Sequence, residues 1–313
     1  MRILSILLVA SLSLAATASA KPPYYDLTGQ FATFVDKTRA MESKARIAAF
    51  RARMNALFPG FYEPRFGASS EQYDKQVARA LNGFDAARPE FDRARQYFPV
   101  AYAAGLKHFR AVFPGFKPNV PVYLLHSLGE MDGGVREIRG KDYLVFGADV
   151  IGRIHDSRDI GPFLDHELFH VENGKYFAEC EALWCGLWLE GLATYAAKAM
   201  NPGADDRQLM LNFPKPIRAA TDAVWASALC LTRAKAGSTK QDDYMDFLAA
   251  SNNPEGQFAQ RFGYYVGLRV MEELAATHPL AELAHMTNLQ AKPLFEASLD
   301  RLIERAGGCQ APA

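Results

Sequence analysis

The segment His166-Glu167-Leu168-Phe169-His170 places two of the seven histidines of this chain four residues apart. On an α-helix, residues at this spacing share a face, with their Cβ atoms about 5 to 6 Å apart. Both imidazoles can then reach one metal ion at the roughly 2.0 to 2.1 Å of a Zn–N bond. Glu167 projects beside the same face, where it can hold the proton of an attacking water. The segment therefore predicts a helix that carries a zinc site, with Glu167 as the catalytic base.

A catalytic zinc site needs a third protein ligand and leaves its fourth position open. An extended motif on the same helix would require a glycine at position 173 and a histidine at position 176, where this chain has Asn173 and Tyr176. Glu190 is the better candidate, because the small residues Gly191 and Ala193 allow its helix to approach the histidine helix closely. A helix returning antiparallel would bring the Glu190 carboxylate to the two histidines.

These assignments have structural alternatives that the residues alone leave open. The histidine segment also fits a surface helix with an acidic first turn and solvated imidazoles. Glu190 also fits an ordinary helix whose apolar face packs into the core. Glu172 lies too close along the histidine helix to turn back to the metal, and Glu181 lies in the turn region near Cys180.

The two segments together resemble the gluzincin, or peptidase MA-like, zinc metallopeptidases. In these enzymes a second, tryptophan-led helix carries Glu-Gly-x-Ala-x-Tyr, which Trp188–Tyr195 (WLEGLATY) matches. The spacing from His170 to Glu190 is one residue longer than in the aminopeptidase branch, and the chain looks closest to the predicted periplasmic zinc proteases of bacteria. The resemblance implies Zn²⁺ as the cofactor, His166, His170 and Glu190 as its ligands, and a peptide or protein as the substrate.

A third match lies in the segment Arg261–Arg269 (RFGYYVGLR). In aminopeptidase-type gluzincins, a tyrosine three residues before a glycine stabilises the oxyanion of the tetrahedral intermediate. Tyr264 and Gly267 have this spacing, so the resemblance implies a catalytic role for Tyr264. Tyr265 is the competing tyrosine, and Gly263 with Gly267 fits a close helix contact equally well.

The first third of the chain is predicted to be helical. From Asp26 to about Phe113, apolar residues recur at intervals of three and four residues. Two of these helical segments run into the same tetrapeptide, FPGF, at Phe58–Phe61 and Phe113–Phe116. Proline and glycine stop a helix, and we expect the flanking phenylalanines to pack back onto it.

The middle of the chain predicts a small sheet at about residues 118–150. The segments Val120–Leu125 and Tyr143–Phe146 are rich in β-branched and aromatic residues and predict strands, while the glycine-rich Gly129–Gly134 predicts a turn. From Ile160 onward the pattern is helical again, so the fold class is α+β and mostly helical, with the histidine helix next to the sheet. By analogy with gluzincins, the strand Tyr143–Phe146 is the edge along which an extended peptide lies.

The first twenty residues predict an export signal. Arg2 precedes an apolar run, and Ala18–Ala20 fits the small-x-small pattern that a signal peptidase accepts. Because the run is shorter than the roughly 20 residues of a membrane span, we expect cleavage, a periplasmic or secreted chain, and no stable membrane insertion. The expected regions are a signal peptide (residues 1–20), a helical N-terminal region (residues 21–117) and a zincin-like metallopeptidase region packed against it (residues 118–313).

Charge and cysteine content limit the partners and the compartment. Basic and acidic residues balance at 35 each, which gives no reason to expect nucleic acid as a partner. Four cysteines in an oxidising compartment can form two disulfides in three ways. Proximity favours Cys180 with Cys185, which leaves Cys230 for Cys309, and buried free thiols are the alternative.

Two other functions fit the same residues. A zinc hydrolase of a non-peptide amide or ester would use the same three ligands and the same glutamate, since these serve any attack on a carbonyl. A non-catalytic exported zinc- or peptide-binding protein would use the metal only to join two helices. Glu167 counts against the second, because a structural zinc site needs no base and usually fills its fourth position with protein.

Overall fold

The structure is a computed structural model that describes residues 24–309 except residue 66, residues 156–158, residue 179 and residues 251–256. The expected signal peptide lies outside the described residues. Helices dominate, and a single four-stranded sheet accompanies them in this part of the chain, which confirms the α+β prediction. None of the described helices has the length and apolar character that a membrane span requires.

The elements follow one another in this order: β1 (Tyr25–Asp26), α1 (Thr28–Lys37), α2 (Ser43–Leu57), α3 (Ser70–Val112), β2 (Val122–Leu125), β3 (Gly133–Glu137), β4 (Asp142–Gly147), α4 (Ala148–Ile154), α5 (Gly161–Asn173), α6 (Leu183–Met200), α7 (Ile217–Asp222), α8 (Trp225–Lys235), α9 (Gln241–Leu248), α10 (Phe262–Leu274), α11 (Leu280–Ala284) and α12 (Asn288–Arg305).

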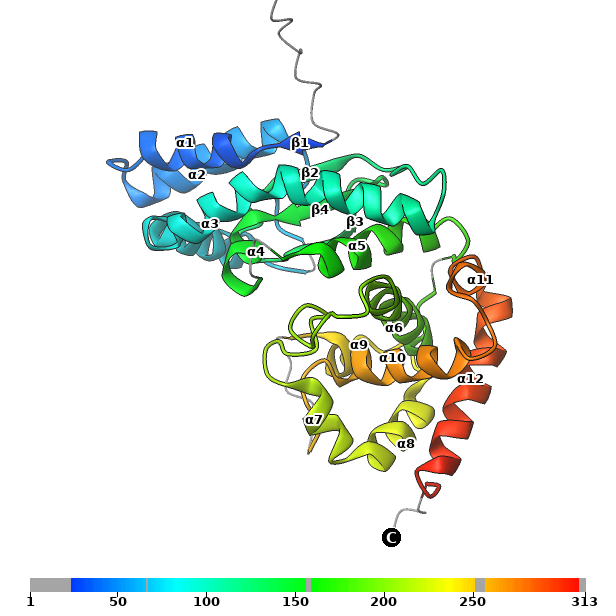
Figure 1. The fold of residues 1–313 in the computed structure, drawn as a ribbon. Coiled ribbons are helices and arrows are strands. Elements are labelled where there is room, and N and C mark those ends of the chain that lie inside the picture. The colour runs from blue at the N-terminus through cyan, green and yellow to red at the C-terminus, as the bar shows by residue number, and fades with distance from the viewer. Residues whose placement is uncertain (1–23, 66, 156–158, 179, 251–256, 310–313) are drawn as a thin grey trace, which may run out of the picture.

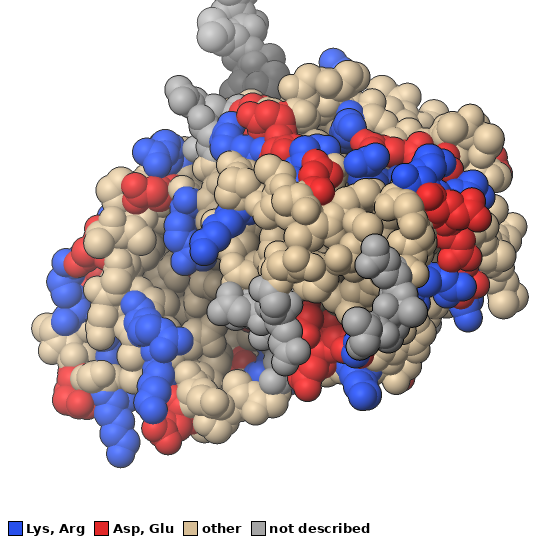
Figure 2. All heavy atoms as spheres, turned by 90° about the horizontal axis from the view of Figure 1, so that it is seen from below, with Lys and Arg blue, Asp and Glu red and all other residues tan. Residues whose placement is uncertain are grey.

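The molecule has two halves, which meet where α5 packs against α6. Figure 1 shows α1 to α5 and the sheet in the upper half and α6 to α12 in the lower half. One hydrophobic core nevertheless extends through both, from Tyr24 to Leu302. On the face shown in Figure 2, basic and acidic side chains are interspersed, as the balanced composition suggests.

Both FPGF segments end helices as expected. α2 stops at Leu57 and α3 at Val112, and all four phenylalanines of the two segments are buried. Gly60 and Gly115 have φ values of +90° and +84°, a left-handed conformation that glycine adopts without steric cost. The chain can therefore turn sharply after each helix, and the phenylalanines return to the core.

The sheet has the strand order β1-β2-β4-β3, in which β1, β2 and β4 are parallel and β3 is antiparallel to β4. The predicted strands at Val120–Leu125 and Tyr143–Phe146 are present as β2 and β4. β3 was not predicted, since its first two residues, Gly133 and Gly134, belong to the segment expected to be a turn. The expectation that Tyr143–Phe146 is the substrate edge is wrong, because β4 is paired on both sides. The edge that lies against α5 belongs to β3.

Both expected disulfides are present. Cys180 and Cys185 are joined with their Cα atoms 5.9 Å apart, and Cys230 and Cys309 with theirs 5.6 Å apart. The first closes the turn that leads into α6, and the second fastens the end of the chain to α8. The prediction from proximity is confirmed, and the alternative of free thiols is wrong.

Candidate metal centre

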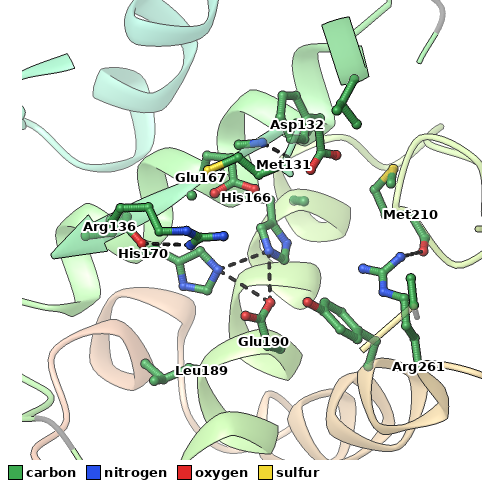
Figure 3. A pocket seen from close by; sticks show the side chains of 18 of the residues that line it. Met131, Asp132, Arg136, His166, Glu167, His170, Leu189, Glu190, Met210 and Arg261 are labelled. Carbon is green, nitrogen blue, oxygen red and sulfur yellow. Dashed lines mark hydrogen bonds and ion pairs between the residues drawn. The ribbon is translucent and has the colours of Figure 1, made fainter. Parts of the chain in front are cut away.

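α5 and α6 bring three candidate ligand atoms together at the spacing of a zinc site. His166 Nε2 lies 3.1 Å from His170 Nε2 and 3.2 Å from Glu190 Oε2, and the latter two atoms are 3.5 Å apart. Three atoms bonded to one zinc ion at 2.0 to 2.1 Å and at tetrahedral angles lie about 3.3 Å from one another. Figure 3 shows the three side chains converging on one point. Within the described residues, this is the only such cluster of His, Cys, Asp and Glu groups.

Electrostatics within the cluster favour a bound cation. Burial opposes ionisation of Glu190, but His170 and His166 outweigh it and hold the pKa of this carboxyl well below its usual range. Burial lowers the pKa of His166. At His170 burial acts in the same direction, but Glu190 outweighs it and raises the pKa. The site therefore presents an ionised carboxylate and two imidazole nitrogens to one point.

Glu190 is held in place by a contact between α6 and α10. A Cβ atom on Gly191 would lie 2.4 Å from the carbonyl carbon of Gly267, and a Cβ on Gly267 would lie 2.5 Å from the carbonyl oxygen of Leu187. Only glycine fits at either position, because backbone touches backbone. We expected Gly191 to let α6 approach the histidine helix. This is wrong, since Gly191 faces α10, and the contact instead places α10 next to Glu190.

Glu167 lies directly beneath β3. A Cβ atom on Gly133 would lie 2.9 Å from Glu167 Cγ and 2.7 Å from Phe163 Cζ. Glu167 is 7% exposed, and its Oε2 atom is buried without a hydrogen-bond partner in the described part of the chain. Burial raises the pKa of Glu167 to about 8. A buried carboxyl oxygen without a hydrogen-bond partner, at the side of the three candidate ligands, fits a group that binds water next to a metal ion.

Of the two adjacent tyrosines, the structure brings Tyr264 to the ligands. Its ring is stacked with that of His166 at a centroid distance of 6.5 Å, and it lines the same cleft. Burial, with Glu190 adding to it, raises the pKa of Tyr264 well above its usual value, so its hydroxyl stays a donor. Tyr265 faces the other way, where its hydroxyl donates to Asp222 Oδ1 at 2.8 Å and accepts from Arg269 at 3.0 Å.

The acidic neighbours of the histidines hold α5 in the fold. Asp165 is fully buried and forms hydrogen bonds with His108 on α3 (2.9 Å) and with Asn201 at the end of α6 (2.8 Å). Glu172 binds Lys175 and, at 3.3 Å, His285. Both carboxylates thus have partners outside the ligand set, and they fix the helix that presents His166 and His170.

A cleft of about 970 Å³ between the two halves contains the candidate site. β3, α4 and α5 line it on one side, and α6, α9, α10, residues 208–210 and Phe213 line it on the other. Its lining includes side chains that were not identified from the sequence, among them Arg136 on β3, Tyr244 on α9 and Arg261 before α10. Their positions depend on strand register and on loops, and neither leaves a periodic signal in the sequence.

Arg261 connects the lower wall of this cleft to Tyr264. The guanidinium carbon lies 4.1 Å from the centroid of the Tyr264 ring, and Nη1 donates to the carbonyl oxygens of Met210 and Phe213. Arg261 has a φ of +62°, which is uncommon for a residue with a side chain. The only sequence signal was indirect, because Arg261 opens the segment that contains Tyr264.

Comparison with known proteins places this chain in no family. No protein-family model, no curated protein and no solved structure matches it. The functional argument therefore rests on the residues of the chain and their geometry.

Proposed function

We propose that this protein is an exported zinc-dependent metallopeptidase that cleaves peptide bonds. The observation that carries the proposal is the set of three ligand atoms 3.1 to 3.5 Å apart, beside a buried glutamate oxygen for which the described residues supply no partner. A purely structural zinc site would have little use for such a carboxylate, whereas hydrolysis requires a base next to the metal.

Each residue of the site has a defined role in this proposal. His166, His170 and Glu190 would hold the zinc ion. When bound, zinc supplies a Lewis acid that lowers the pKa of water and polarises a carbonyl group. Glu167 accepts the proton of the attacking water and delivers it to the leaving amine. Tyr264 donates its hydroxyl hydrogen to the carbonyl oxygen as negative charge develops there.

Among the described strands, β3 has one edge that pairs with no other strand, and this edge favours a peptide as the substrate. Gly147 N–H donates to the carbonyl oxygen of Asp132 at 2.8 Å, and in an antiparallel ladder such bonded pairs alternate with non-bonded ones. The backbone groups of Gly133 and Val135 therefore point away from β4. An extended peptide can add to this edge as a further strand, directly above Glu167. A small ester or amide would make no use of the edge.

The proposal is tested by digesting a peptide library with the zinc-loaded protein and with its Glu167→Gln variant. Glutamine keeps the size of the side chain but cannot accept the proton, so we expect kcat/KM to fall by about 100-fold or more. Zinc content should be unchanged, since Glu167 is not a ligand. If the wild-type protein binds zinc but cleaves the same peptides as the variant, or none at all, the peptidase proposal is wrong.

A further inference from the structure

Arg136 on β3 has a guanidinium group whose hydrogen-bonding capacity is largely unused. Its Nη1 atom donates to the carbonyl oxygen of its own neighbour, Val135, at 2.9 Å. Its Nε atom is buried and has no hydrogen-bond partner in the described chain. The ion-pair partner, Glu130 Oε1, lies 3.7 Å from Nε, which is too long for a hydrogen bond.

Glu130 is more strongly engaged elsewhere. Its Oε2 atom accepts a hydrogen bond from Arg65 Nη2 at 2.5 Å, whereas Arg136 makes only the looser ion contact. Because Glu130 is bound by Arg65, it does not accept hydrogen bonds from the planar set of N–H donors on the Arg136 guanidinium group. Arg136 therefore remains able to bind another carboxylate.

The side chain of Arg136 is directed into the cleft. A Cβ atom on Gly134 would lie 3.1 Å from Arg136 Nη1, so the side chain lies back across Gly134, where the strand has none to obstruct it. Arg136 lines the cleft together with the ligands and is 31% exposed. Figure 3 shows its guanidinium group on the side of His170, away from Arg261.

We infer that Arg136 is a specificity residue that binds a carboxylate of the substrate next to the cleaved bond, so that the enzyme prefers acidic peptides. The inference rests on the proposed peptidase function. The Val135 carbonyl oxygen, which now accepts the hydrogen bond from Arg136 Nη1, is one of the backbone groups of β3 that point away from β4. A substrate N–H that binds this carbonyl displaces Nη1, and the guanidinium group can then donate two parallel hydrogen bonds to a carboxylate.

The test uses pairs of peptides that differ only in Glu against Gln, or Asp against Asn, beside the cleaved bond. Hydrogen bonds to charged groups contribute about 1.5 to 3 kcal/mol, so the wild-type protein should prefer the acidic member about tenfold or more in kcat/KM. Arg136→Gln should abolish the preference, and Arg136→Lys should retain part of it, because lysine keeps the charge but not the fork.

Arg139→Gln is the matched control. Arg139 lies in the same hairpin, is 60% exposed and pairs with Glu63 outside the cleft. This variant removes the same charge, so its preference for acidic peptides should equal that of the wild type. If the wild type cleaves both members of each pair equally, the inference is wrong while the peptidase proposal stands. The same holds if Arg139→Gln abolishes the preference as fully as Arg136→Gln.

A binding measurement separates the inference from the proposed function. The Glu167→Gln variant, with and without Arg136→Gln, is titrated calorimetrically with the acidic and neutral peptides. Tighter binding of the acidic peptide that is lost with Arg136→Gln supports carboxylate binding by Arg136. If the wild type also cleaves nothing, the peptidase proposal and the cleavage preference that rests on it are wrong, while the binding role of Arg136 stands. Equal binding of both peptides overturns the inference.

Discussion

The two walls of the cleft achieve close contact in different ways. On the upper wall, β3 lies on α5 through Gly133, and the atoms that a Cβ would meet are the side chains of Phe163 and Glu167. On the lower wall, α6 lies on α10 through Gly191 and Gly267, and the atoms that meet are backbone. A side chain can rotate away from a close contact, whereas the backbone of a packed helix cannot.

This difference matches what the two walls must do in the proposed mechanism. The lower wall holds Glu190, which must meet two histidines on another helix at the spacing of a metal site, so it needs a rigid contact. The upper wall holds Glu167, whose carboxylate must take a proton and give it up again. Changes at the α6–α10 contact behind Glu190 are therefore expected to affect stability most, and changes at the β3–α5 contact above Glu167 to affect turnover most.

Gly191→Ala is expected to have the largest effect. Its Cβ atom would lie 2.4 Å from Gly267, where no side chain can yield, so we expect a loss of about 3 kcal/mol of unfolding free energy. Zinc retention should also weaken, because α6 must move. Urea denaturation and metal analysis measure both effects. Gly203→Ala is the control, because its Cβ would meet nothing within 4 Å. If Gly191→Ala is as stable as Gly203→Ala, the contact between α6 and α10 is not rigid.

Tyr264→Phe is expected to have the second-largest effect. Removal of one donor to a developing oxyanion costs about 100-fold in kcat, with KM and stability little changed. Steady-state kinetics on a cleaved peptide measure this effect. Tyr265→Phe is the matched control: it loses its hydrogen bonds to Asp222 and Arg269, so it should cost about 1 kcal/mol of stability and leave kcat unchanged. The reverse pattern would assign the catalytic role to Tyr265.

Gly133→Ala should have the smallest effect and should act on turnover alone. The new methyl group must displace the side chains of Glu167 and Phe163, and a displaced base is expected to lower kcat about tenfold, or about 1.4 kcal/mol. Zinc content should not change. Gly29→Ala, on α1 and with nothing near its Cβ, controls for a general effect of alanine. Zinc loss without slower turnover would contradict the assignment of the base to the β3–α5 contact and of Glu190 to the α6–α10 contact.

The clustering of the candidate site residues could be predicted because it depends on local spacing or short motifs. His166 and His170 share a helix, and helical periodicity alone places them on one face. Glu190 was identified through the motif around it, and the structure brings it within 3.5 Å of both imidazoles. The disulfides could be predicted because two of the four cysteines are only five residues apart.

The β3 side of the candidate site could not be predicted, because it depends on tertiary context. Gly133 and Gly134 indicate a turn, since glycine is depleted in strands, yet pairing with β4 makes them the start of β3. The same glycines allow β3 to approach Glu167 and Arg136 to lie over the strand. Strand order is also nonlocal, which is why β4 was mistaken for the edge. The position of Arg261 depends on a loop contact and has no periodic pattern.

The central claim is that His166, His170 and Glu190 hold a zinc ion, and metal analysis of purified variants tests it most directly. Zinc content after dialysis against a weak chelator is measured for the wild type, Glu190→Ala and Glu181→Ala, in which the control residue is an exposed glutamate just before α6. We predict about one zinc ion per chain in the wild type and in Glu181→Ala, and little in Glu190→Ala. Full zinc content in Glu190→Ala, or its loss in Glu181→Ala, would contradict the account.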